Sequence, residues 1–217
     1  MNNKEKFLPV PFRIGFYPIV NSISWLVCML DCGVKIIQLR IKNKSKIYIE
    51  KSIEASVLLG NHYNAKIFIN DYWQLAIRYR AYGVHLGQED MIQANKILIR
   101  QSKLRLGLST HNEEELNRSL SWNPSYIALG HIFPTSTKNM LSKPQGLKKL
   151  KYWVNKLKNI PTVAIGGINL NSLNSVLDSG VGGISVISAI IKSKNWRKET
   201  KNFMEKISKW EKKNKIY

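Results

Sequence analysis

The chain of 217 residues is short of cysteine, acidic side chains and long apolar runs. Cys28 and Cys32 are its only cysteines. We expect both to be reduced and partly buried, with a catalytic or metal-binding pair as the alternative. No apolar run reaches the roughly 20 residues of a membrane span, and residues 1–12 lack the apolar core of a signal peptide. We therefore expect a cytoplasmic protein with no membrane partner.

Acidic residues number 14 against 34 lysines and arginines, which gives a net charge of +20. This excess makes nucleic-acid binding a hypothesis to weigh. The lysines are scattered, however, and the aromatic residues fall mostly at core-like positions. In the basic stretch 192–215, apolar residues recur at helical spacing, which predicts an amphipathic helix with a solvated lysine face. We expect the positive field to attract anionic substrates rather than nucleic acid.

Short apolar runs alternate with helix-like segments along the whole chain, about every 20 to 35 residues. The predicted strands are 14–20, 35–40, 66–70, 83–86, 104–109, 126–130, 162–165 and 183–186. The predicted helices are 22–31, 46–59, 72–82, 91–101, 113–122, 147–158, 170–179 and 195–212. Gly60 and Gly180 stand where two of these helices should end.

Eight β/α units predict a single compact (β/α)8 TIM barrel spanning residues 1–217. Residues 1–13 are then an N-terminal extension, and residues 192–217 form a basic C-terminal helix. A doubly wound open sheet is the alternative, but no GxGxxG follows the first strand and no strand is left over.

An aspartate follows each of two neighbouring predicted strands. Asp71 comes directly after strand 66–70, and Asp90 comes shortly after strand 83–86. Adjacent parallel strands deliver both carboxylates to the same edge of the sheet. Taken singly, either acid could be a helix cap. Together they suit Mg²⁺, which takes one or two carboxylates and completes its shell with water and substrate phosphate.

The stretch after the second strand alternates polar and apolar residues. Gln38, Arg40 and Lys42 share one face, while Leu39 and Ile41 point to the other and can pack under helices. Polar groups at the barrel mouth suit an anionic or polar ligand, because guanidinium and ammonium groups bind phosphate. The alternative is a strand end with ordinary solvated charges.

The later strand ends predict a second anion site. Hydroxyls and the Lys138 ammonium gather in residues 135–138, within the longest connection, 133–146, with a solvated turn as the alternative. The ammonium is counted with Arg40, Lys42 and the metal at the first site. Gly166 and Gly167 allow close backbone approach, and Ile187 and Ser188 open a helical stretch whose free amides favour anions. Two anion sites suggest two phosphorylated substrates, or one long one. After the fifth strand, Ser109 and its neighbours could equally be helix caps.

These motifs together resemble the thiamine-phosphate synthase family. The resemblance covers about residues 14–191 and rests on QLRIK, IND, GVHLGQED, GLSTH, YIALGHIFPTSTK, VAIGGI and GISVISAI. It implies a (β/α)8 enzyme that joins 4-amino-5-hydroxymethyl-2-methylpyrimidine diphosphate to 4-methyl-5-(2-phosphoethyl)thiazole, giving thiamine phosphate and pyrophosphate. The substitution it implies is dissociative, so stabilising the leaving charge matters more than a protein nucleophile.

The resemblance also implies a role for each matching position. Asp71 and Asp90 are the expected ligands of Mg²⁺, and Arg40, Lys42 and Lys138 are the expected catalytic charges. The expected contacts of the pyrimidine diphosphate are Gln38, Leu39, Arg40, Ile41, Lys42, Asn70, Ser109 and Lys138. Those of the thiazole phosphate are Thr135, Ser136, Thr137, Gly167, Ile187 and Ser188.

Two other functions remain to be weighed. A related thiazole tautomerase would share the barrel and the thiazole phosphate site, but it would not need the diphosphate-binding charges. A basic nucleic-acid-binding protein would need exposed aromatic residues interleaved with the lysines. We expect two phosphorylated small molecules as partners, and self-association into a homo-oligomer is left open.

Overall fold

The computed structural model describes residues 6–135 and 142–214, and its strands close into a barrel. All eight run parallel, and β8 pairs with β1 through Gly183 and Gly15. In chain order they are β1 (Gly15–Val20), β2 (Ile36–Leu39), β3 (Lys66–Asn70), β4 (Gly83–Leu86), β5 (Arg105–Thr110), β6 (Tyr126–Leu129), β7 (Thr162–Ile165) and β8 (Gly183–Val186). The predicted (β/α)8 barrel is confirmed.

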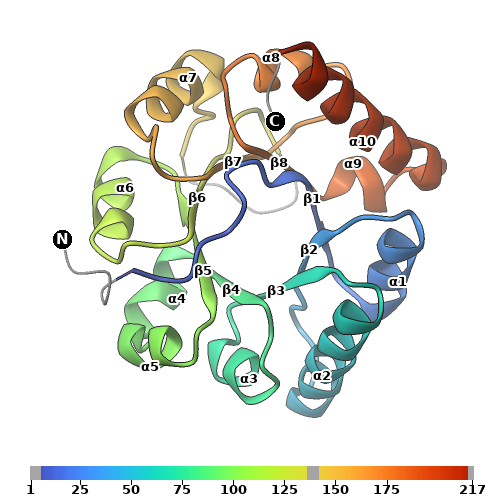
Figure 1. Ribbon diagram of the computed structural model, residues 1–217, viewed down its shortest axis with the longest axis vertical. Helices are drawn as coiled ribbons and strands as arrows, with labels where there is room; N and C mark the ends of the chain where they lie inside the picture. Colours follow the sequence, from blue (N-terminus) through green and yellow to red (C-terminus); the bar gives the residue numbers. More distant parts are fainter. Residues whose placement is uncertain (1–5, 136–141, 215–217) are drawn as a thin grey trace.

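Helices surround the barrel and bury their apolar sides against the strands (Figure 1). Those in the described ranges are α1 (Ile23–Asp31), α2 (Lys46–His62), α3 (Trp73–Arg78), α4 (Gln88–Gln93), α5 (Lys96–Gln101), α6 (Glu113–Leu120), α7 (Gly146–Lys156), α8 (Leu173–Leu177), α9 (Ser188–Ile191) and α10 (Trp196–Lys213). The predicted helix 91–101 is wrong as a single element. It is broken before Asn95, whose side chain accepts a hydrogen bond from the Leu98 amide and caps α5.

The two glycines predicted to end helices behave differently. Gly180 follows α8 at φ +85°, and its amide donates to the carbonyl of Leu177, as expected of a helix-terminating glycine. Gly60 lies inside α2, so the helix end predicted there is wrong. A Cβ at Gly60 would lie 2.6 Å from Cγ1 of Ile67 on β3. Glycine at this position therefore lets the helix approach the sheet closely.

Large aromatic rings fill the part of the barrel interior that lies towards the amino-terminal ends of the strands. Tyr17, Phe68 and Tyr126 pack edge to face, with ring centroids 5.4–5.9 Å apart. Two inward-facing glycines make room for them. A Cβ at Gly107 would lie 2.1 Å from the Tyr126 ring, and one at Gly83 would lie 2.4 Å from the Phe68 ring. The rings therefore form a solid floor inside the barrel.

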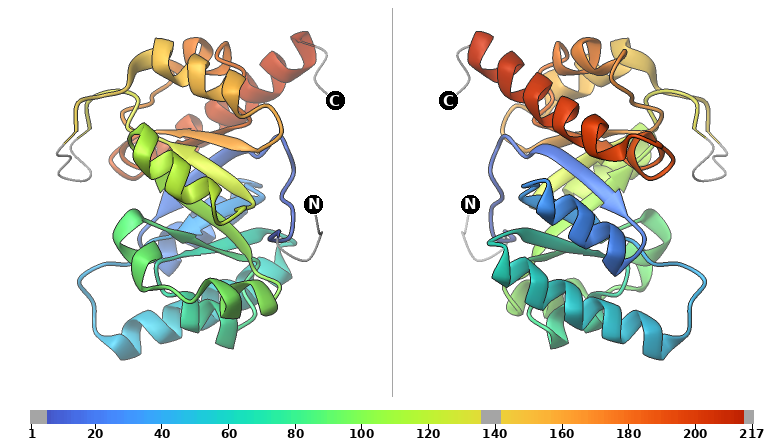
Figure 2. Two further views of the ribbon diagram at one scale, coloured as in Figure 1. Left: turned by 90° about the vertical axis from the view of Figure 1, so that its left-hand side faces the viewer. Right: turned by 90° about the vertical axis from the view of Figure 1, so that its right-hand side faces the viewer.

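The N-terminal segment, residues 6–14, crosses the amino-terminal end of the barrel (Figure 1). The Arg105 side chain donates to the carbonyl of Pro9 at 3.1 Å, and that of Arg13 donates to the carbonyl of Val181 at 2.9 Å. In the side views this segment and the loop after β2 lie at opposite ends of the barrel (Figure 2). Residues 1–5 of the predicted extension lie outside the described residues.

The basic final helix, α10, is amphipathic, as predicted from the spacing of its apolar residues. Phe203 and Ile207 are buried, and the Phe203 ring stacks on Phe16 of β1 at 5.3 Å. Cys28 within α1 and Cys32 at its C-terminal cap are free and half-buried. Within residues 6–135 and 142–214, no helix combines the length and the apolar character needed to cross a membrane.

Candidate functional site

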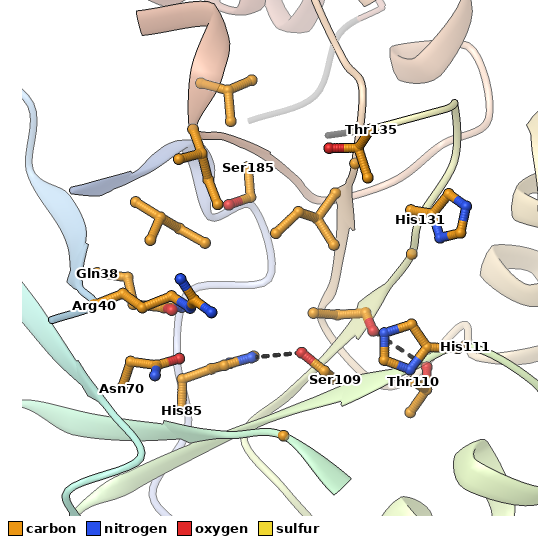
Figure 3. Close-up of a pocket in the computed structure, with 18 of the residues that line it drawn as sticks. Gln38, Arg40, Asn70, His85, Ser109, Thr110, His111, His131, Thr135 and Ser185 are labelled. Carbon is orange, nitrogen blue, oxygen red and sulfur yellow. Dashed lines mark hydrogen bonds between the residues drawn. The ribbon is translucent and has the colours of Figure 1, made fainter. Parts of the chain in front are cut away.

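A cavity of about 240 Å³ opens at the carboxyl-terminal end of the barrel, and many of the residues that line it are drawn in Figure 3. This is the end at which TIM barrels place their chemistry. The predicted site residues that line it are Gln38, Arg40, Lys42, Asn70, Asp71, Asp90, Ser109, Thr135, Gly167, Ile187 and Ser188. Residues from β2, β3, β4, β5, β6, β7 and β8 or the turns that follow these strands thus meet around one space.

The end of β2 has the predicted alternation. Gln38, Arg40 and Lys42 line the cavity, whereas Leu39 and Ile41 are buried in the hydrophobic core. Any contact of Leu39 or Ile41 with a ligand would therefore use backbone atoms, since their side chains point away. Arg40 and Lys42 bring two positive charges to the rim, and the buried amide of Gln38 lies deeper.

The two aspartates lie side by side, as predicted. Asp71 forms an ion pair with Lys42. Its φ is +65°, a conformation that non-glycine residues adopt rarely and that clusters at functional sites. Asp90, in the first turn of α4, has its pKa raised to about 6. Burial is the main cause, followed by a hydrogen bond and charge repulsion from Asp71.

This carboxylate pair fits a divalent, oxygen-preferring cation. The negative charges of Asp71 and Asp90 repel each other, and this repulsion contributes to the raised pKa of Asp90. A metal ion bound between them would relieve it. Within the described part of the chain, no cluster of three or more histidine, cysteine or acidic residues could hold a metal ion. The donor set therefore suits Mg²⁺ with water and substrate phosphate, rather than an ion held wholly by protein.

The opposite wall is built from backbone and small side chains. Gly166 and Gly167 have φ of +101° and +66°. A Cβ on Gly167 would lie 2.5 Å from the carbonyl oxygen of Pro134, and one on Gly166 would lie 2.3 Å from Cβ of His131. The glycines therefore let the loop after β7 pack against the loop after β6. Ser136, Thr137 and Lys138 lie outside the described residues.

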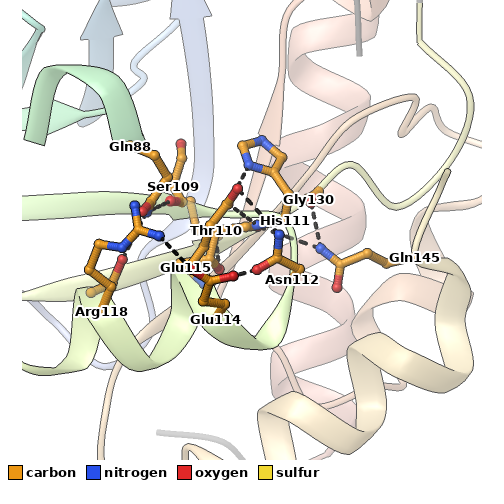
Figure 4. Close-up of polar contacts among 12 residues, drawn as sticks. Gln88, Ser109, Thr110, His111, Asn112, Glu114, Glu115, Arg118, Gly130 and Gln145 are labelled. Atoms are coloured by element: carbon orange, nitrogen blue, oxygen red, sulfur yellow. Dashed lines mark hydrogen bonds and ion pairs between the residues drawn. The ribbon is translucent and has the colours of Figure 1, made fainter. Parts of the chain in front are cut away.

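Side chains of α4 and α6 make polar contacts with the end of β5 and the residue that follows it (Figure 4). Gln88 donates to the Ser109 carbonyl at 2.7 Å and to the Ser119 hydroxyl at 3.0 Å. Glu115 accepts from the His111 amide at 2.8 Å. The expectation that Ser109 could be a cap is wrong, because Asn112 caps α6 and the Ser109 side chain faces the cavity.

Comparison with known proteins fits this geometry. The family model described as thiamine monophosphate synthase matches residues 17–190. The chain belongs to the thiamine monophosphate synthase family.

Similar proteins cover nearly the whole chain. The thiamine-phosphate synthase of Cronobacter sakazakii is 52% identical over 199 residues, which is 92% of this chain and 95% of that protein. The thiamine-phosphate synthase of Proteus mirabilis is 51% identical over 206 residues, or 95% and 96% of the two chains. The solved structure of thiamine phosphate pyrophosphorylase from Pyrococcus furiosus has a TM-score of 0.79 at 29% identity, covering 96% of this chain and 98% of that one.

In this member of the thiamine monophosphate synthase family, the cavity contains polar residues that the sequence argument missed. His85 and Ser185 line it, and both lie at the centre of strands whose flanking residues are apolar. That alternation, in GVHL and GISV, was the signal that could have found them. Burial lowers the pKa of His85 to about 4, so it is neutral at neutral pH.

Some buried polar atoms at the wall have no protein partner within the described residues. They are Nδ2 of Asn70, Nδ1 of His131 and Oγ of Ser185. Buried polar groups are normally hydrogen-bonded, because leaving one unpaired costs about 1–3 kcal/mol. Asn70, His131 and Ser185 all line the cavity. They suit a ligand with polar atoms of its own.

Proposed function

We propose that this protein is a thiamine-phosphate synthase. It joins 4-amino-5-hydroxymethyl-2-methylpyrimidine diphosphate to 4-methyl-5-(2-phosphoethyl)thiazole and releases pyrophosphate. The observation that carries the proposal is the meeting, around one cavity, of a charged wall from β2, β3 and β4 with a glycine- and hydroxyl-lined wall from β6, β7 and β8. Two different phosphate-bearing molecules suit two different walls.

The charged wall suits the diphosphate. Arg40 can bind phosphate oxygens with its planar fork, and Lys42 adds a compact positive charge. Asp71 and Asp90 would hold Mg²⁺ there. When bound, Mg²⁺ supplies positive charge that stabilises the departing pyrophosphate. Lys138 adds a third basic group in this proposal, by the position it occupies in the sequence.

The second wall suits the thiazole phosphate. Thr135, Gly167, Ile187 and Ser188 line it, and the proposal adds Ser136 and Thr137 by their position in the sequence alone, because they lie outside the described residues. Hydroxyl and backbone amide donors at the loops after β7 and β8 are the usual phosphate site of this fold. A phosphate held there would leave the thiazole ring between the two walls, with its nitrogen facing the carbon that loses pyrophosphate.

The reaction then needs little covalent chemistry from the protein. The C–O bond to the diphosphate breaks, and pyrophosphate takes the electron pair. The aminopyrimidine ring delocalises the positive charge that develops on its methylene carbon. The thiazole nitrogen lone pair forms the new C–N bond, and no proton has to be removed. The chain's task is to stabilise the leaving charge and align the two rings.

The test is to incubate the purified protein with both substrates and Mg²⁺ and to measure thiamine phosphate and pyrophosphate. The expected result is equimolar formation of the two products, lost on chelation of the metal and restored by added Mg²⁺. Absence of product with a folded protein would overturn the proposal. A salt-sensitive shift of labelled DNA, with no turnover, would instead support the nucleic-acid-binding alternative.

A further inference from the structure

A chain of hydrogen bonds crosses the barrel just beneath the cavity. The Gln38 amide donates to the Tyr17 hydroxyl at 3.1 Å, and that hydroxyl lies 2.8 Å from the hydroxyl of Tyr126. The Tyr126 oxygen lies 2.8 Å from Nδ1 of His85, whose Nε2 lies 2.8 Å from Oγ of Ser109 (Figure 3). The chain therefore joins Gln38 on β2 to Ser109 on β5 through three side chains that are fully or almost fully buried, of which His85 also lines the cavity.

With the Gln38 amide donating to Tyr17, full satisfaction of these groups sets the direction of each following hydrogen bond. Tyr17 accepts from Gln38, so its own hydrogen goes to the oxygen of Tyr126. The Tyr126 hydrogen then goes to Nδ1 of His85. A neutral imidazole that accepts at Nδ1 carries its proton at Nε2 and donates to the oxygen of Ser109. The Ser109 hydrogen is then left over for the cavity.

The Gln38 end of this hydrogen-bond chain offers an acceptor to the cavity, whereas the Ser109 end offers a donor. Gln38 uses its NH₂ group on Tyr17, which leaves its carbonyl oxygen to accept from a ligand. Turning this amide over would reverse every donor in the chain, so that Gln38 would donate and Ser109 would accept. In either direction, the two ends offer one donor and one acceptor, because the buried links between them are hydrogen-bonded in series.

We propose that His85 is a positioning residue that sets the hydrogen-bonding character of Ser109, so that Gln38 and Ser109 act as a matched acceptor and donor for an aminopyrimidine ring. The inference rests on the proposed function for the identity of that ring. An exocyclic amino group donates, and a ring nitrogen accepts, so a 4-aminopyrimidine carries both groups that the pair requires. A ring with a carbonyl in place of the amino group would meet the Gln38 oxygen with another acceptor.

Two substitutions of His85 separate this role from simple packing. In His85→Asn the amide reaches the position of Nδ1 but not that of Nε2, so Ser109 loses its partner. In His85→Gln the longer side chain can place an NH₂ group near the position of Nε2. We expect kcat/KM for the pyrimidine diphosphate to fall about 10- to 100-fold in His85→Asn, and His85→Gln to recover most of it. The KM for the thiazole phosphate should change less than about twofold in both.

A double-mutant cycle tests the link to Ser109. If His85 acts through Ser109, adding His85→Asn to Ser109→Ala should cost little more than Ser109→Ala alone. If the two substitutions instead lower kcat/KM independently, so that the fold-changes multiply in the double variant, His85 has a merely structural role and the inference is overturned. Equal changes in the KM of both substrates would overturn it too. So would a His85→Gln variant that is folded and no better than His85→Asn.

Binding measurements separate failure of this inference from failure of the proposed function. Calorimetry would compare the dissociation constants of pyrimidine diphosphate and of inorganic pyrophosphate, both with Mg²⁺, because their ratio isolates the ring. Wild-type protein that binds both equally would contradict the proposed function. A wild-type preference that His85→Asn retains in full would overturn only the role of His85.

The tyrosine link has a matched control. Tyr126→Phe removes the hydroxyl that fixes the His85 proton, and it should reduce the preference for the ring-bearing ligand about three- to tenfold. Tyr79→Phe removes a hydroxyl that binds Glu50 outside the barrel, and it should leave the preference unchanged. Equal effects of the two substitutions would contradict the directed chain.

Discussion

The two walls of the cavity offer different groups to a bound phosphate, if the proposed function is correct. The wall from β2, β3 and β4 uses charged side chains, Arg40, Lys42, Asp71 and Asp90. The wall from β6, β7 and β8 uses backbone and small residues, with Gly166 and Gly167 at positive φ. Charged side chains and a metal ion can stabilise the charge on a departing group, whereas backbone amides can hold a phosphate that stays attached. This difference agrees with a diphosphate that departs on one side and a phosphate that is retained on the other.

The largest expected effect is loss of the carboxylate at Asp71. Asp71→Asn keeps the shape and tolerates the positive φ, but it removes one of the two negative charges that would hold Mg²⁺. We expect kcat/KM to fall about 10²- to 10³-fold, measured as thiamine phosphate formed at several Mg²⁺ concentrations. Glu50→Gln is the matched control, because Glu50 pairs with Arg78 outside the cavity. Unchanged turnover in Asp71→Asn would remove Asp71 from the metal site.

Arg40→Lys tests whether the charged wall needs shape as well as charge. The substitution keeps the positive charge but loses the planar fork, and with it at least one charge-assisted hydrogen bond to phosphate. One such bond contributes about 1.5–3 kcal/mol, which corresponds to a fall in kcat/KM of about 10- to 100-fold. Steady-state kinetics with the pyrimidine diphosphate as the varied substrate measures it. A change confined to the KM of the thiazole phosphate would show that the two walls have been assigned the wrong way round.

Gly167→Ala tests the backbone wall. The new Cβ would press on the Pro134 carbonyl, and the positive φ alone costs about 1–2 kcal/mol. We expect lower stability in thermal unfolding and about a tenfold higher KM for the thiazole phosphate, with the KM of the other substrate nearly unchanged. Gly33→Ala is the control, since Gly33 has φ +85° and nothing within 4 Å of the added Cβ. If both variants alter turnover equally, the effect reflects stability rather than the wall.

The smallest expected effect comes from salt. Raising the ionic strength screens exposed charges, and the Debye length falls to about 3 Å at 1 M. We expect the KM of the pyrimidine diphosphate to rise about two- to threefold more than that of the thiazole phosphate, because the first depends on charged side chains. Initial rates at matched free Mg²⁺ would measure the ratio. Equal sensitivity of both substrates would indicate attraction by the overall charge of +20 alone.

Much of the fold could be predicted because strand and helix patterns alternate clearly along the chain. Asp71 and Asp90 could be placed together, since residues after adjacent parallel strands share one edge. The role of Gly60 could not, because it depends on the approach of Ile67 from a different element. The break before Asn95 was visible as a capping residue, but the helical spacing across it concealed the boundary.

Within the candidate site, the charged residues were easier to find than the neutral ones. Arg40 and Lys42 draw attention because charge beside a buried strand needs an explanation. His85 and Ser185 required a consistent use of strand alternation. The hydrogen-bond partners of His85 could not be predicted at all, since its link to Tyr126 joins residues on β4 and β6.

The N-terminal segment and the rings of Tyr17, Phe68 and Tyr126 close the base of the barrel. Ligands therefore enter and leave the described cavity through its rim. A pyrimidine resting on the floor would have to arrive before the thiazole covers it. While the thiazole lies above it, the pyrimidine could leave only as part of the joined product, so the closed base would favour binding of the pyrimidine first.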